Sequence, residues 1–164
     1  MIKGETRGRS LEALRASGSV AARGADRQRA PGNAMAAAEP AAVESVTHRR
    51  YVPYSHAHYG GNLVDGAYVL GLFGDVATEV CIRLDGDEGL LASFSEVQFR
   101  APVRAGDVLE ITAAVIRVGR RSRDLAFEAR VTCRADPERG PSAAQVLSDP
   151  LVAVTATGTV VVPL

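Results

Sequence analysis

The chain has 164 residues and a mass of 17.2 kDa, which allows one folded domain and leaves little room for a second core. Its 19 basic and 19 acidic side chains balance, so composition gives no general attraction for nucleic acid or an anionic membrane. No apolar run approaches the roughly 20 residues that span a bilayer, and the N-terminus lacks the apolar core of a secretory signal. Cys81 and Cys133 lie in apolar runs, which predicts buried, reduced thiols in a cytoplasmic protein.

Residues 1–44 are rich in Ala, Arg, Gly and Ser and contain no aromatic side chain. Such a segment cannot bury enough apolar surface to offset its ordering entropy, so we expect a disordered extension. Two alternatives stay open: the Arg-rich stretch is a targeting leader, or translation begins at Met35. Each interpretation leaves residues 45–164 as the folded domain.

A buried helix is predicted after the turn residues Gly60 and Gly61. Asn62 is a suitable N-cap, and apolar or small residues then recur in steps of three and four from Leu63 to about Val80. Because apolar side chains fill most of its circumference, this helix is expected to be buried rather than to lie on a surface.

Strands are predicted on both sides of that helix. Val46 to Tyr54 is expected to form the first strand, and alternating or β-branched residues predict the others. The later strands are expected at 90–99, 108–118, 125–134 and 151–163, with a loop at 136–150. This order predicts an α+β fold in which a single antiparallel sheet of about five strands wraps one long helix. The open edge of such a sheet favours pairing into a homodimer or a dimer-based oligomer.

One stretch carries a family resemblance. It begins with Ser55-His-Ala-His-Tyr-Gly-Gly-Asn-Leu-Val-Asp-Gly-Ala and continues to Phe73-Gly-Asp-Val-Ala-Thr-Glu. This stretch resembles the 3-aminoacyl-CoA ammonia-lyases, which act on 3-aminobutyryl-CoA or β-alanyl-CoA. The resemblance extends from about His48 to Val160, and Asp136–Gln145 departs from the shorter family members as an insertion. It implies a hotdog fold and an enzyme that reversibly eliminates ammonia from a 3-aminoacyl-CoA to give the 2-enoyl-CoA, a step of amino acid degradation. No cofactor is implied, because coenzyme A is part of the substrate.

The reaction needs a base for the α-proton, donors for the enolate oxygen and an acid for the leaving amine. A buried helix N-terminus supplies donors, so Gly60, Gly61 and Asn62 are predicted to bind the thioester. His58 and Tyr59 precede this turn and match the family pattern. They are predicted to protonate or orient the amine or the carbonyl.

Asp75 and Glu79 are the predicted base. They are four residues apart and share a helix face, where mutual repulsion would raise the pKa of one carboxyl. The alternative is that this face meets solvent near the helix C-terminus. Asp65, where the family tolerates an amide, and Glu96 are further acidic candidates for substrate binding.

Arg120, Arg121 and Arg123 crowd one turn, where they are predicted to bind the phosphates of coenzyme A; a solvated charge run is the alternative. No metal-binding motif occurs, so no metal is expected.

Two other functions compete with the lyase: an acyl-CoA thioesterase on the same fold, and a non-catalytic acyl-CoA-binding protein. Related hydrolases place an acidic residue seven positions after the helix-opening glycine. Counted from Gly66 this position is Phe73, which cannot activate water, although Asp75 could substitute. A binding protein would need the pocket but not the carboxylates.

Overall fold

The computed structural model describes residues 45–163. The predictions for residues 1–44, a disordered extension or a start at Met35, lie outside the described residues. No helix of the described part is long and apolar enough to cross a membrane.

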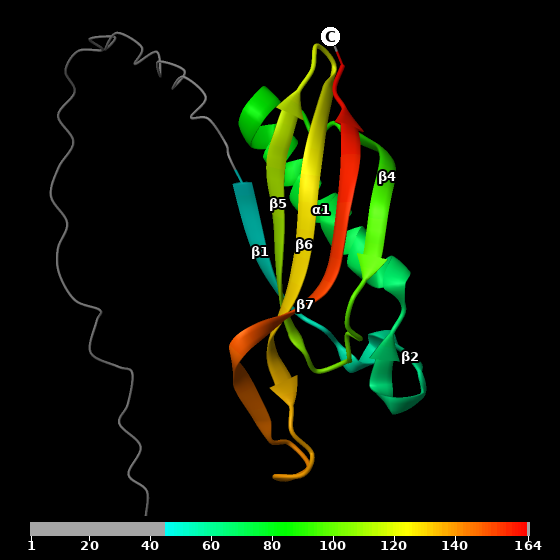
Figure 1. Cartoon of the computed structure of the whole chain (residues 1–164), viewed down its shortest axis with the longest axis vertical. Helices are drawn as coiled ribbons and strands as arrows, with labels where there is room; N and C mark the ends of the chain where they lie inside the picture. The colour runs from blue at the N-terminus through cyan, green and yellow to red at the C-terminus, as the bar shows by residue number, and fades with distance from the viewer. Residues whose placement is uncertain (1–44, 164) are drawn as a thin grey trace, which may run out of the picture. The chain divides into compact units, whose positions relative to one another are not determined.

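The described part is a five-stranded antiparallel sheet with one long helix on one of its faces (Figure 1). The strand order is β1-β5-β6-β7-β4, so β1 and β4 form the two edges. The strands are β1 (Ser45–Tyr51), β4 (Leu90–Phe99), β5 (Val108–Val118), β6 (Ser122–Ala135) and β7 (Ala144–Val161). The predicted α+β hotdog arrangement, one helix wrapped by a single antiparallel sheet, is confirmed.

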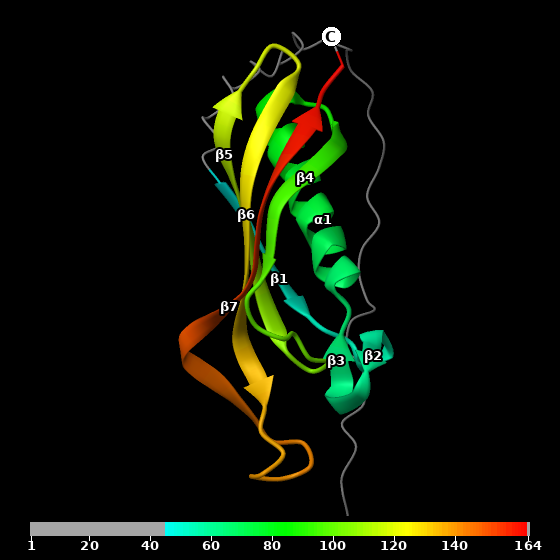
Figure 2. The same ribbon diagram turned by 45° about the vertical axis from the view of Figure 1, so that its right-hand side comes forward.

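Helix α1 (Gly66–Asp85) runs along the inner face of the sheet (Figure 2). Its buried side chains extend over more than three turns and face the strands; they are Val69, Leu72, Phe73, Val76, Ala77, Val80 and Cys81. Phe73 is fully buried and stacks on Phe127 of β6 at a ring-centre distance of 5.0 Å. Because each buried Val, Leu or Phe contributes about 1.5–3 kcal/mol, burial of this helix face is one of the main contributions to stability.

The predicted start of the helix is wrong by several residues. Asp65, not Asn62, is the N-cap: its carboxylate accepts a hydrogen bond from the backbone N–H of Tyr68 at 3.0 Å. Asn62 has a φ of 59°, in the left-handed region, whereas an N-cap needs an extended backbone. Gly60–Asn62 is a separate 3-10 turn, η2, and short strand β3 (Leu63–Val64) follows it.

The helix also runs beyond the predicted end at Val80. It continues to Asp85 and is terminated by Gly86, whose φ of 69° is the left-handed conformation favoured at helix ends. Strand β2 (Ala57–Tyr59) pairs with β3, and together they bring the chain from β1 to the start of α1. A 3-10 turn, η1 (Tyr54–His56), replaces the predicted end of the first strand.

The predicted loop at 136–150 is also partly wrong. β7 begins at Ala144, and Ala144–Val146 pair with β6, so only the first half of that segment is a loop. Pro150 lies in β7 where the pairing with β6 is interrupted, between Val146 and Leu151. Its missing N–H therefore costs no ladder hydrogen bond. Cys81 is buried as predicted, but Cys133 near the end of β6 is only half-buried.

Candidate functional site

A cavity of about 380 Å³ lies at the N-terminus of α1. The chain segment before the helix, the helix start and the end of β4 form its walls; the residues used below are Tyr59, Asp65, Gly66, Phe99 and Arg100. The first backbone N–H groups of a helix have no intrahelical acceptor and carry partial positive charge. The cavity therefore places hydrogen-bond donors where a carbonyl or enolate oxygen can bind.

Two backbone hydrogen bonds hold the segment before the helix in place. Val64 donates to the carbonyl of Val103 at 3.0 Å, and Ala105 donates to the carbonyl of Asn62 at 2.9 Å. Gly66 closes the cavity on the other side, because a Cβ at this position would lie 2.6 Å from the ring of Phe99. Neither Phe99 nor Arg100 was predicted as a site residue, although both directly precede the Ala-Pro turn at the end of a strand.

Of the two predicted residues before the turn, only Tyr59 lines this cavity. Its ring is 58% exposed, and the imidazole of His58 packs edge-on against it at 4.4 Å between ring centres. Gly60 and Gly61 form the exposed η2 turn rather than the helix N-terminus, and so do not present helix N–H groups. Asp65 uses one carboxylate oxygen as the N-cap, a role that an amide also fills.

The predicted carboxylate pair lies elsewhere, beside the groove between α1 and β1. A hollow of about 440 Å³ is lined there by Asp75 together with His48 and Arg50 of β1. Glu79 accepts from His48 at 2.5 Å and from Arg83 at 2.7 Å. These two hydrogen bonds lower the pKa of the Glu79 carboxyl below its usual range, His48 having the larger effect. Glu79 is therefore an ionised ion-pair partner, while Asp75 is exposed.

His48 was not identified from the sequence. Its position two residues after the buried Val46 on β1 places both side chains on the strand face that meets α1, and this alternation was the available signal. Asp75 lies nine positions after Gly66 on the helix, which is about 14 Å along the axis. Within one protomer, the cavity at the start of α1 and Asp75 therefore cannot both contact the same three-carbon acyl group.

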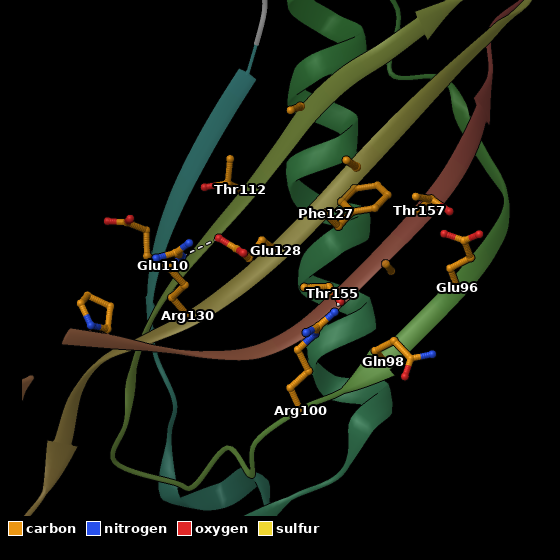
Figure 3. Close-up of a pocket in the computed structure, with 14 residues that line it drawn as sticks. Glu96, Gln98, Arg100, Glu110, Thr112, Phe127, Glu128, Arg130, Thr155 and Thr157 are labelled. Atoms are coloured by element: carbon orange, nitrogen blue, oxygen red, sulfur yellow. Dashed lines mark hydrogen bonds and ion pairs between the residues drawn. The ribbon is translucent and has the colours of Figure 1, made fainter.

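Glu96 lies on a β-bulge of β4, between Ser95 and Gln98, and has a φ of 51°. It lines an open groove of about 850 Å³ on the sheet face opposite α1 (Figure 3). Glu110, Glu128 and Arg130 line the same groove, and Arg100 lies between this groove and the cavity at α1. The structure thus directs Glu96 away from α1, because the bulge rotates its side chain out of the regular alternation.

The three arginines of the β5–β6 turn separate into two environments. Arg123 is buried and pairs with Asp85 at the C-terminal end of α1, and it also donates to the carbonyls of Gly119 and Ser122. Its guanidinium is thus occupied, which contradicts the prediction that it is available to phosphate. Arg120 and Arg121 are exposed at that turn, at the opposite end of α1 from the cavity.

Residues 61–138 match the thioesterase superfamily. The chain is 50% identical over 107 residues to a 3-aminobutyryl-CoA ammonia lyase of Acetoanaerobium sticklandii, covering 65% of this chain and 85% of that protein. The chain belongs to the 3-aminoacyl-CoA ammonia-lyase family. The β-alanyl-CoA:ammonia lyase from Clostridium propionicum superimposes with a TM-score of 0.68 at 33% identity, over 73% of this chain and 85% of that one.

More distant structures share the fold of this family. A hexameric hotdog fold thioesterase of Campylobacter jejuni superimposes with a TM-score of 0.57 at 19% identity, over 71% of this chain and 81% of that one. At this identity the likeness shows the fold alone. Among residues 45–163, no group of three or more His, Cys, Asp or Glu side chains could hold a metal ion.

Proposed function

We propose that this chain is a carbon–nitrogen lyase that reversibly eliminates ammonia from a 3-aminoacyl-CoA, with 3-aminobutyryl-CoA or β-alanyl-CoA as substrate. The observation that carries the proposal is the similarity to two ammonia lyases over 85% of each of them. The cavity at the start of α1 supports it, because it offers backbone donors beside a tyrosine. The reaction as proposed needs no cofactor, and the expected cytoplasmic location stays a prediction.

The thioester oxygen is proposed to bind the backbone N–H groups of Gly66 and Ala67. Asp65 already satisfies the N–H of Tyr68, so these two donors are the ones left for a ligand. As the α-proton leaves, negative charge develops on this oxygen, and fixed donors stabilise it. Tyr59 lines this cavity, and we propose that its hydroxyl protonates the leaving amine.

Asp75 is the better candidate for the base of the two predicted carboxylates. Glu79 has both oxygens occupied by His48 and Arg83, and the lowered pKa makes it a weak proton acceptor. Because Asp75 is about 14 Å along α1 from Gly66, we propose that the Asp75 that serves this cavity belongs to a second copy.

Edge strand β4 is the proposed pairing edge of a homodimer. Its outer side has no partner strand among the described residues, and it carries two exposed apolar side chains, Leu90 (73% exposed) and Phe99 (58%). Pairing there would satisfy the free backbone groups and cover these side chains. Phe99 also lines the α1 cavity, so the pairing edge and the cavity are continuous. Hexameric assembly is described for the Campylobacter thioesterase, and a dimer-based oligomer of this chain is consistent with it.

The test is to incubate the protein with crotonyl-CoA or acryloyl-CoA and ammonium, and to analyse the products by mass. The addition of ammonia across the double bond is expected. Release of free coenzyme A from saturated and unsaturated esters is measured in parallel. Hydrolysis without amination would replace the lyase by the thioesterase alternative, and binding without either reaction would leave only the acyl-CoA-binding alternative.

A further inference from the structure

A second cavity, of about 400 Å³, lies next to the α1 cavity and is not used by the reaction proposed above. It lies between η1, η2 and the loop that joins β6 to β7; the residues that matter are Tyr54, Asn62, Arg104, Pro137 and Pro141. We propose that this cavity binds the nucleotide end of the coenzyme A ester, with Arg104 as the ligand of its phosphates. The inference rests on the proposed function only in that the substrate is a CoA ester.

This cavity and the α1 cavity are close enough to bind the two ends of one coenzyme A ester. The segments 62–64 and 103–105 are joined by two backbone hydrogen bonds, Val64 to Val103 and Ala105 to Asn62. Val64 and Val103 line the α1 cavity, whereas Asn62 and Ala105 line the second cavity. The two cavities are therefore neighbours along one short ladder, where strands advance about 3.3 Å per residue. The flexible pantetheine arm can connect a thioester in one cavity with a nucleotide in the other.

The charge of this cavity favours an anion. None of its lining residues is acidic, and Arg104 makes no ion pair with any residue of the described part. The carboxylate of Asp107, which accepts a hydrogen bond from the backbone N–H of Arg104, is already bound by the Arg134 side chain through two hydrogen bonds of 2.7 and 3.0 Å. The larger groove on the outer sheet face differs, because its three carboxylates, Glu96, Glu110 and Glu128, outnumber its two arginines, Arg100 and Arg130. Arg130 is also hydrogen-bonded to Glu128, so the cavity at Arg104 is the more favourable of the two for phosphate.

The remaining walls suit an adenine ring. Tyr54 is 58% exposed, and Pro137 and Pro141, whose rings are rigid and apolar, line the same cavity. Tyr54 is held against the backbone of Gly106, where an added Cβ would lie 2.9 Å from the tyrosine hydroxyl. Both prolines belong to the segment by which this chain departs from shorter family members, so the insertion supplies one wall of the site.

The inference is tested by measuring the binding of coenzyme A and of pantetheine by calorimetry to the wild-type chain, Arg104→Gln and Arg139→Gln. Arg139 lies in the same loop but does not line the cavity, so it controls for net charge. Loss of a charge-assisted contact predicts about 10- to 100-fold weaker binding of coenzyme A to Arg104→Gln and unchanged pantetheine binding. Arg139→Gln should match the wild type for both ligands.

The outcomes separate this inference from the proposed function. If the wild type aminates crotonyl-CoA but Arg104→Gln binds coenzyme A normally, the proposed nucleotide site is wrong and the lyase function is supported. If no amination occurs but Arg104→Gln selectively loses coenzyme A binding, the lyase function is wrong and the proposed nucleotide site is supported. Equal weakening for both ligands would assign Arg104 a structural role. The double variant Arg120→Gln/Arg121→Gln is measured in the same way. If it selectively loses coenzyme A binding while Arg104→Gln binds coenzyme A normally, the phosphates bind at the β5–β6 turn and the inference is overturned.

Discussion

The imidazole Nε2 of His48 lies 2.5 Å from the carboxylate Oε2 of Glu79, and this contact ties edge strand β1 to the middle of α1. Arg83, one helical turn further along, binds the other oxygen of the same carboxylate. Glu79 therefore has two cationic or donor partners on two elements. Its ionised form is stabilised by the fold, which is the reason for its lowered pKa.

The first prediction is that Glu79→Gln lowers the melting temperature at pH 7, because the ion pair with Arg83 and the charged hydrogen bond to His48 are lost. Since the folded-state pKa is below the ordinary value of 4.5, the stabilisation is present above pH 4.5 and is lost as the pH falls through the folded pKa. The melting temperatures of the two proteins should therefore converge in acid. Asp75→Asn, which removes an exposed carboxylate on the same helix, is the control and should melt like the wild type. Equal melting temperatures of Glu79→Gln and the wild type at pH 7 would show that the contacts of Glu79 with His48 and Arg83 contribute nothing to stability.

The second prediction concerns the base. Asp75→Asn should slow the exchange of the α-hydrogens of butyryl-CoA with deuterated water by about 10²–10⁴-fold, because it removes the proton acceptor and keeps the shape of the side chain. This exchange requires the base but no leaving amine, so it isolates the first step. Glu79→Gln should retain more exchange than Asp75→Asn when both are measured below their melting temperatures. If Asp75→Asn exchanges the α-hydrogens at the wild-type rate, Asp75 is not the base, and Tyr59 or His58 becomes the candidate.

The helix, the five strands and the α+β class were predictable, because hydrophobic periodicity and β-branched composition depend on neighbours in the sequence. The start of the helix was not: Asn62 and Asp65 are both good N-cap residues, and the choice depends on the pairing of Leu63–Val64 with Ala57–Tyr59. The hydrogen-bond partners of Glu79 were not predictable for the same reason, and its pKa is lowered where repulsion from Asp75 was expected to raise the pKa of one of the two carboxyls. Repulsion between Asp75 and Glu79 is a local expectation, whereas the partner His48 is 31 residues away in the sequence.

The third prediction uses the contact between Gly66 and Phe99. Gly66→Ala adds a methyl group that meets the Phe99 ring at 2.6 Å, so the ring must turn away. Phe99 is 58% exposed, so this movement costs little, and alanine gains up to about 1 kcal/mol over glycine in a helix. The variant is expected to be as stable as the wild type but to have a raised KM, because a wall of the cavity moves. Gly71→Ala, where an added Cβ meets nothing within 4 Å, should leave KM unchanged. An unchanged KM in Gly66→Ala would argue against substrate binding in this cavity.

The last prediction tests whether Tyr59 and Asp75 serve one site from two protomers. Tyr59→Phe and Asp75→Asn are each expected to be nearly inactive alone. When the two variants are co-expressed with different affinity tags and purified through both tags, every assembly contains both. In a mixed dimer with shared sites, one site carries both substitutions and the other carries none, so activity returns at about half the wild-type level. If each site used one protomer only, every site in the mixture would hold one substitution and no activity would return. The matched control pairs Tyr59→Phe with the double variant Tyr59→Phe/Asp75→Asn, which contains no intact site in either arrangement. Recovery in the first mixture and none in the control would place Tyr59 and Asp75 of each site on different copies of the chain, in keeping with the distance of about 14 Å along α1 between Gly66 in the cavity and Asp75.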